Sequence, residues 1–167
     1  MPRFFVSKEN INEEERSISI LGEDAFHIAR SLRMAVGDTL TVCDGEGMDY
    51  ECNLTKIRDD RVDCDIEISR PCPAEPPYRA TLYQALVKGD KFDTVVQKAV
   101  ECGASRIVPF ISERCVVRLT KKDCEKKIVR WQRIAAEAAK QCGRGIIPQV
   151  SDLLTFDEMT AEAAGAD

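Results

Sequence analysis

The sequence offers little that would support metal binding, disulfide bonding or membrane insertion. One histidine occurs in 167 residues, and no two of the eight cysteines have the separation of two to four residues typical of zinc ligands. No run of about 18 uncharged apolar residues is present, which excludes a membrane-spanning helix. Acidic residues in the opening MPRFFVSKENINEEER stand where a signal peptide needs an apolar core. We therefore predict a cytoplasmic chain with reduced cysteines and no metal.

The sequence also lacks the glycines of the common nucleotide-binding loops. ALVKGDKFD, residues 85–93, has the strand–glycine–lysine–helix arrangement that binds phosphate in many proteins. Only Gly89 is present, however, where P-loop and dinucleotide-binding fingerprints need additional glycines. Two interpretations of Lys88 and Lys91 stay open: solvated lysines of an ordinary strand–helix turn, or contacts to a nucleic-acid backbone.

Basic charge is concentrated in one part of this acidic chain. Residues 1–79 contain 10 Lys and Arg against 17 Asp and Glu, whereas residues 80–167 contain 14 against 12. All 14 of the latter bases lie between Lys88 and Arg144, where only 7 acids occur. A local excess of positive charge within an acidic protein is the pattern expected of a polyanion-binding surface.

Proline separates two patterns of secondary structure. RPCPAEPPYRA, residues 70–80, stops any helix or central strand. Before it, five short β-type runs and one helix over residues 23–33 predict a small β-barrel. After it, strand and helix alternate, which predicts an α/β unit with a parallel sheet. We predict an α+β chain with a barrel over residues 1–72, a linker over residues 73–79 and an α/β unit over residues 80–167.

The helix predicted over residues 123–142 has a polar stripe that continues to Arg144. It contains five bases, Lys126, Arg130, Arg133, Lys140 and Arg144, against the single acid Glu137. A solvated face braced by Arg133 and Glu137 is one interpretation, but this excess suits phosphates better than mutual salt bridges. In the first unit, His27 accompanies Arg30 and Arg33 on the helix, where phosphate contact and a half-buried structural histidine are both open.

Three blocks carry a family resemblance: FHIARSLRMAVGDTLTVCDGEG (26–47), LYQALVKGDKFDTVVQKAVECGASRIVPFISERCVV (82–117) and RWQRIAAEAAKQCGRGIIPQV (130–150). They closely resemble the RsmE family of 16S ribosomal RNA uridine-N3 methyltransferases, in order and with matching spacing from Arg3 to about Phe156. Family members continue through a GPEGG-like turn and an LGxRILRxETA-like segment, and neither is in this sequence. The chain thus resembles the first part of such an enzyme, truncated before the knot.

The resemblance implies a PUA-like β-barrel that helps to hold RNA, followed by a SPOUT-type α/β methyltransferase domain with a trefoil knot. It implies a homodimer that uses S-adenosylmethionine to methylate N3 of one uridine in the 16S RNA of the small ribosomal subunit. The cofactor site is expected mainly beyond Asp167, so the 167-residue chain alone is expected to be inactive. Neither DNA nor a membrane is an expected partner.

Residue roles follow from the resemblance and from the predicted fold. The predicted catalytic residues are Arg114, Glu137, Gln141 and Arg144. The predicted RNA contacts are His27, Arg30, Arg33, Lys88, Lys91, Lys98, Ser112, Glu113, Arg130 and Arg133. Residues 112–114 follow a strand of the α/β sheet, at the carboxyl edge where ligands bind in such folds, and we expect the end of helix 123–142 to point to the same edge. Two other functions stay open: a non-catalytic RNA-binding or ribosome-assembly module, and a small-molecule α/β enzyme.

Overall fold

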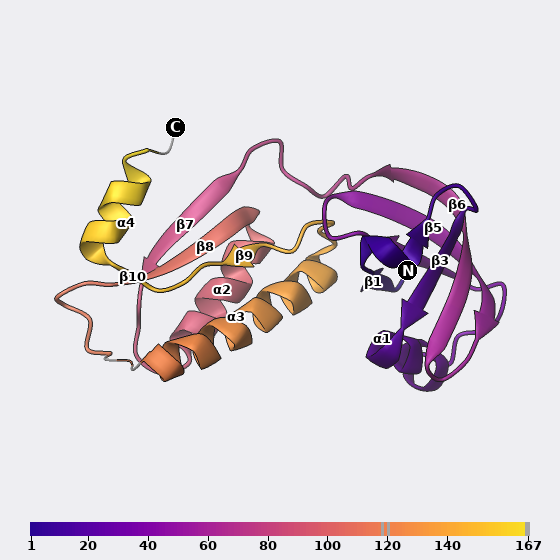
Figure 1. Cartoon of the computed structure of the whole chain (residues 1–167), viewed down its shortest axis with the longest axis horizontal. Coiled ribbons are helices and arrows are strands. Elements are labelled where there is room, and N and C mark those ends of the chain that lie inside the picture. Colours follow the sequence, from indigo (N-terminus) through magenta and orange to yellow (C-terminus); the bar gives the residue numbers. More distant parts are fainter. Residues whose placement is uncertain (118, 120, 166–167) are drawn as a thin grey trace. The chain divides into compact units, whose positions relative to one another are not determined.

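The structure is a computed structural model that describes residues 1–117, 119 and 121–165. It divides into two compact units (Figure 1). Unit 1 contains Met1–Glu75 and Gly143–Ile146, and unit 2 contains Pro76–Cys142 and Ile147–Asp167. The predicted linker, residues 73–79, spans the point at which the chain passes from one unit to the other. The predicted end of the second domain, Asp167, lies outside the described residues.

Unit 1 is built on one curled, six-stranded sheet with the strand order β1-β4-β5-β6-β3-β2 (Figure 1). All neighbouring strands are antiparallel except β1 and β4. The elements of this unit are β1 (Arg3–Phe5), η1 (Lys8–Asn10), β2 (Ile11–Asn12), β3 (Ser17–Leu21), α1 (Gly22–Phe26), η2 (His27–Ser31), β4 (Thr39–Cys43), β5 (Met48–Ile57) and β6 (Arg61–Pro71). Five of the strands match the β-type runs of the sequence, and the two-residue β2 is an addition.

Alternation along the long strands places the core of unit 1 on one face of the sheet. In β6, Val62, Cys64 and Ile66 are buried while the intervening residues are not, as expected of a strand with one wet face. Ala25 and Ile28, from the helical segment, are fully buried against the same core. The apolar periodicity of residues 23–33 thus located a helical element correctly, although its second part, η2, is a π-helical turn.

Unit 2 is a parallel sheet with helices, as predicted. Its elements are β7 (Ala80–Ala85), α2 (Lys91–Glu101), β8 (Ala104–Ile111), α3 (Lys121–Cys142), β9 (Gln149–Val150), β10 (Leu154–Thr155) and α4 (Phe156–Ala163). β8 is central: it pairs with β7 on one side and with β9 and β10 on the other, always in parallel. α2 and α3 pack on each other (Figure 1). Their contact includes the rings of Phe92 and Trp131, with centroids 4.3 Å apart.

The predicted fold class, a β-barrel-like unit followed by an α/β unit, is confirmed by this architecture. Two further observations concern membrane spans and metal ligands. No helix within the described residues is long and apolar enough to cross a membrane. Among the same residues, no three His, Cys, Asp or Glu side chains come close enough together to hold a metal ion.

Candidate functional site

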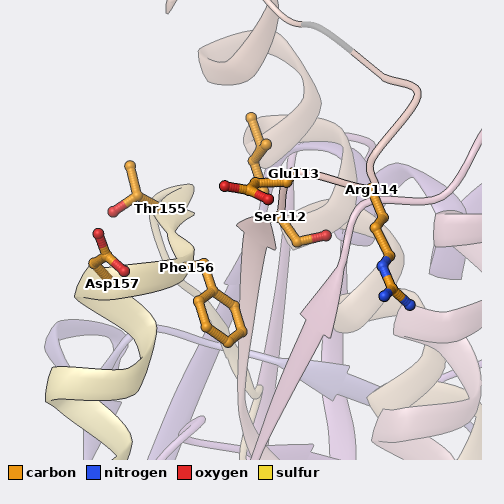
Figure 2. A pocket seen from close by; sticks show the side chains of 7 residues that line it. Ser112, Glu113, Arg114, Thr155, Phe156 and Asp157 are labelled. Carbon is orange, nitrogen blue, oxygen red and sulfur yellow. The ribbon is translucent and has the colours of Figure 1, made fainter.

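Unit 2 has a pocket at the carboxyl ends of two adjacent strands. β10 pairs with the end of β8, so that Thr155 lies beside Ile111 and the residues that follow each strand emerge side by side. They enclose a pocket of about 710 Å³ (Figure 2). We call it the edge pocket, and its lining residues are Ile111, Ser112, Glu113, Arg114, Thr155, Phe156 and Asp157. The carboxyl edge of a parallel sheet is where ligands usually bind in such folds.

One wall of the edge pocket is the turn Ser112–Arg114. Cys115 stabilises this turn through two hydrogen bonds to Ser112. The Cys115 backbone N–H donates to the Ser112 carbonyl at 3.0 Å, and the buried Cys115 sulfur accepts from the Ser112 N–H at 3.3 Å. Glu113 and Arg114 are exposed, and neither has an ion pair or hydrogen bond to its side chain among the described residues. Figure 2 shows Arg114 on the far side of Ser112 from Thr155 and Asp157. The turn is therefore fixed while its charged groups stay available.

The opposite wall is the first turn of α4. Thr155 and Glu158 form a capping box, in which Thr155 Oγ1 accepts from the Glu158 N–H at 3.2 Å and Glu158 Oε2 accepts from the Thr155 N–H at 2.7 Å. The backbone hydrogen bond from Thr155 is the main cause of a lowered Glu158 pKa. Farther along the helix, Glu162 accepts from Arg106 of β8 at 2.6 Å. These contacts pin α4 to the sheet.

The edge pocket combines an aromatic ring with several polar groups. Phe156 is half-exposed, and its ring meets that of Phe110 with centroids 6.1 Å apart. Around it stand the carboxylates of Glu113 and Asp157, and Arg114 supplies a guanidinium. Carboxylates accept hydrogen bonds from N–H and hydroxyl groups, and a guanidinium donates to carbonyl oxygens. The pocket can thus bind a planar ligand that has both donors and acceptors on its edge.

Sequence reasoning found one wall of this pocket and missed the other. Ser112, Glu113 and Arg114 were predicted from their place after a strand, but Thr155, Phe156 and Asp157 were not. The available signal was the sequence TFDE at residues 155–158, in which a hydroxyl residue is followed three residues later by Glu, the pattern of a capping box. That pattern locates a helix start, yet only the pairing of β10 with β8 places it beside Ser112.

The predicted RNA contacts of unit 2 differ in whether their side chains already have an ion-pair partner. Lys88 and Lys91 are exposed, without an ion pair among the described residues. Lys98, in contrast, is paired with Glu101 at 2.6 Å. Arg130 is paired with Asp93 at 2.5 Å. A paired cation must give up its carboxylate partner to contact a phosphate, so the unpaired lysines are the better candidates.

The end of α3 does not meet the expectation that it points to the edge pocket. In a βαβ unit the helix runs antiparallel to its strands, so it ends at their amino edge. β9, which follows α3, accordingly pairs with Arg106 and Ile107 near the start of β8. The structure places the predicted residues Arg133, Glu137 and Gln141 together in a separate groove of about 260 Å³ between α2 and α3, with Gln97, Ile134 and Ala138. Their roles stay predictions.

Arg144 lies in unit 1, in a buried ion-pair cluster. Its guanidinium, with only 4% of the side chain exposed, donates to Glu75 Oε2 at 2.8 Å. Glu75 Oε1 also accepts from the backbone N–H groups of Gly145 and Ile146, at 2.9 and 3.0 Å. Burial acts to raise the pKa of Glu75, but the hydrogen bonds from Arg144 and the backbone outweigh it, and the pKa is lowered.

A second buried ion pair completes this arrangement. Arg3 donates to both carboxylate oxygens of Asp49 at 2.8 Å and to the Arg144 carbonyl at 3.4 Å. We call these four side chains the Glu75 cluster: Arg3, Asp49, Glu75 and Arg144. Gly145 packs so closely that a Cβ on it would lie 2.6 Å from Cys72 Cβ. The cluster thus fixes the segment Gly143–Ile146 within unit 1. Arg144 belongs to unit 1, whereas Ser112–Arg114 belong to unit 2, and the predicted catalytic role of Arg144 stays a prediction.

Two of the three predicted RNA contacts of unit 1, His27 and Arg30, lie on its helical segment, and Arg33 follows two residues after the end of η2. His27, Arg30 and Arg33 are all exposed, and His27 meets the edge of the Phe4 ring. Arg30 is bound to Asp59 through two hydrogen bonds of 2.6 and 2.9 Å. Arg33 adopts a left-handed backbone conformation (φ 52°) and has no ion pair among the described residues. The sequence therefore placed His27 and Arg30 correctly on a helical element, whereas Arg33 lies just beyond that element and has no ion-pair partner among the described residues.

Comparison with protein families gives each unit a counterpart. Residues 74–167, more than half of the chain, match the RNA methyltransferase domain, and residues 20–67 match the RNA methyltransferase PUA domain. The chain belongs to the RNA methyltransferase family. The resemblance to RsmE enzymes is also confirmed by curated relatives. Ribosomal RNA small subunit methyltransferase E of Bacillus subtilis is 36% identical over 161 residues, and that of Synechocystis is 30% identical over 165.

Solved structures of RNA methyltransferases are similar to this chain in fold. Ribosomal RNA small subunit methyltransferase E from Neisseria gonorrhoeae, bound to S-adenosyl methionine, matches with a TM-score of 0.80 at 32% identity. A putative methyltransferase from Legionella pneumophila, in complex with the same cofactor, matches with a TM-score of 0.80 at 29% identity. The match covers 95% of this chain and 64% of the Neisseria protein, and 95% of this chain and 62% of the Bacillus relative. The chain thus spans less than two thirds of the length of these two proteins.

Proposed function

We propose that the protein takes part in the methylation of N3 of a specific uridine in the 16S RNA of the small ribosomal subunit, with S-adenosylmethionine as the methyl donor. The observation that carries the proposal is the edge pocket at the carboxyl edge of the sheet, which the predicted residues Ser112, Glu113 and Arg114 line together with Phe156. Family membership and the names of the relatives supply the class of reaction.

The residues of the pocket suit the chemistry of uracil N3. The N3–H group loses its proton with a pKa close to that of a phenol, about 10, so a modest electrostatic bias can favour the anion. The Arg114 guanidinium, donating to a uracil carbonyl, would stabilise the negative charge that develops as N3 becomes a nucleophile. The Glu113 carboxylate can accept the hydrogen bond from N3–H and take that proton as N3 becomes the nucleophile, and the Ser112 hydroxyl can bind a second edge atom. These three residues act on the base and need no metal.

The substrate must present an unpaired base. Uracil within an RNA helix is paired through N3, so the target has to be unpaired or flipped out of the stack before it enters the pocket. Exposed cations that have no carboxylate partner among the described residues would hold the RNA backbone, and we assign that role to Lys88, Lys91 and Arg33.

S-adenosylmethionine would supply a methyl group made electrophilic by its sulfonium. The described residues do not form a site that fits this cofactor. Gly89 is the one described glycine with a left-handed φ near the carboxyl edge of the sheet, and the described residues around it do not form a glycine-lined backbone cradle for an adenosyl group. We therefore assign no residue to the cofactor and derive no step through it. The location of its site beyond Asp167 stays a prediction, as does the homodimer.

The test is the modification state of 16S RNA in the source organism. N3-methyluridine is quantified by mass spectrometry in RNA from cells with the gene, without it, and with it restored. The proposal predicts that one N3-methyluridine disappears with the gene and returns with it. Unchanged methylation in cells lacking the gene would refute the proposal. If 16S fragments still bound the protein with a steep loss of affinity in salt, that result would leave the non-catalytic RNA-binding module as the function.

A further inference from the structure

One aromatic side chain of the edge pocket is left in contact with solvent. Phe156 is the first residue of α4, and 50% of it is exposed. Its ring rests against Phe110 at an interplanar angle of 53°, and the side chain is one of those that line the pocket (Figure 2). An apolar ring in water forgoes the stabilisation that burial would give. A ligand that covers the exposed part of the ring would recover it.

The backbone that carries this ring is held in place before any ligand binds. Thr155 caps α4, and it is also the residue of β10 that pairs with Ile111 of β8. At the other end of the helix, Glu162 accepts hydrogen bonds from Arg106 and from Tyr83, at 2.6 and 2.9 Å. A ligand that stacks on the Phe156 ring therefore has little backbone to order, and preorganisation of this kind favours binding.

The groups around the ring select the chemical class of the ligand. Glu113 and Asp157 would repel a free phosphate, and an aliphatic ligand would leave both carboxylates without hydrogen-bond donors. A nucleobase has a planar apolar face for the ring and an edge with N–H and carbonyl groups for the polar wall. An extruded base also needs a new stacking partner to offset the stacking that it loses in RNA.

We propose that Phe156 is the platform on which the target uracil stacks in the edge pocket. This inference rests on the proposed function, which supplies the uridine, and it adds the residue that binds the face of the base. Ser112 and Glu113 reach the edge of the base, while Phe156 contributes affinity for any base because every base has a π-face. The Ser112–Arg114 turn thus selects uracil over other bases, and the Phe156 ring contributes the affinity that keeps the base in the pocket.

The experiment measures binding of two short fluorescent RNAs to the 167-residue chain by anisotropy. The first carries a single uracil on its central nucleotide, flanked by abasic nucleotides, and the second is abasic throughout. For the wild type we expect tighter binding of the single-base RNA. Phe156→Leu should weaken that binding about tenfold, in line with the worth of one base–aromatic stack, and leave the abasic RNA unaffected. Phe156→Trp should keep the preference.

Tyr78→Leu is the matched control, because Tyr78 is an aromatic residue of the same unit with 59% exposure and no place in the pocket. It should leave both affinities at the wild-type values. Equal binding of the two RNAs by the wild type overturns the inference. So does an equal loss for both RNAs in Phe156→Leu, which would mark the ring as purely structural. Either result leaves the proposed function standing if N3-methyluridine still depends on the gene.

Discussion

Arg114 and Arg144 follow regular elements in similar ways but lie in opposite environments. Arg114 comes three residues after β8, exposed, in a turn whose backbone is fixed by Cys115. Arg144 comes two residues after α3 and is buried, with its guanidinium bound to Glu75. The charge of Arg144 is thus neutralised by the fold, whereas that of Arg114 can still meet a ligand. A cation that the sequence marks as functional can thus be engaged by a structural partner, as Arg144 is by Glu75.

The largest effect is expected on breaking the Glu75 cluster. Arg144→Met should lower the free energy of unfolding by about 3–5 kcal/mol, because it leaves the Glu75 carboxylate buried without its partner. Urea denaturation measures this change. Arg114→Met is the matched control and should stay within about 0.5 kcal/mol of the wild type, because Arg114 is exposed and unpaired among the described residues. Equal stabilities of the two variants would remove the contrast between the arginines.

Gly145→Ala tests the same cluster through packing. The added methyl group would meet Cys72 Cβ at 2.6 Å and force the segment Gly143–Ile146 to shift. We expect a loss of about 1–3 kcal/mol in the free energy of unfolding, typical of overpacking. Gly165→Ala, whose new methyl group would lie 3.7 Å from the nearest heavy atom, should change little. A fully stable Gly145→Ala would show that the segment is not held as the structure has it.

The pH dependence of the free energy of unfolding tests the carboxylates of the Glu75 cluster. The pKa of Glu75 is lowered from 4.5 and that of Asp49 from 3.8, because in each case hydrogen bonds from arginine outweigh the opposing effect of burial. Groups with a lowered folded-state pKa stabilise the protein above their unfolded-state pKa, and that stability is lost as pH falls through the folded-state pKa. The free energy of unfolding should therefore fall below about pH 4.5. The fall should be shallower in Glu75→Gln, and parallel curves from pH 7 to 3 would contradict this.

The smallest effect is expected among the surface lysines. Lys88→Ala should weaken RNA binding and reduce the slope of log affinity against log salt by about one, because the unpaired ammonium is assigned to a phosphate. Lys98→Ala should do less, because Lys98 is already paired with Glu101. Filter binding of 16S fragments across a salt series provides the measurement. An equal change in both variants would show that pairing on the surface does not decide which lysines bind RNA.

The sequence predicted those features that depend on local patterns. The β-type runs before the proline-rich stretch gave the strands of unit 1, among them β6 with Val62 and Cys64 buried, and the alternation of strand and helix after it gave unit 2. The sequence predicted Arg144 on the polar stripe of the helix, because the helical periodicity continues past Gly143. In the structure α3 ends at Cys142, and Arg144 is buried. Its burial depends on Glu75, which is 69 residues distant and lies in a proline-rich stretch without periodicity.

The second wall of the edge pocket, Thr155–Asp157, could not be predicted from the sequence for a different reason. Nothing local in the sequence indicates that the first turn of α4 lies beside Ser112. That neighbourhood comes from the register of β10 on β8, and a two-residue strand leaves almost no pattern in the sequence. Strand pairing over long separations is set by the whole sheet, so a pocket built on it appears only in three dimensions.

The most direct test of the contrast between the two arginines is the amount of N3-methyluridine in 16S RNA from cells whose only copy of the gene carries Arg114→Met, at a protein level equal to the wild type. We predict that the modification rate falls about a hundredfold, the usual loss when one donor to a developing negative charge is removed, while the protein stays folded. Wild-type methylation in these cells would contradict the assignment of Arg114 to the reacting base.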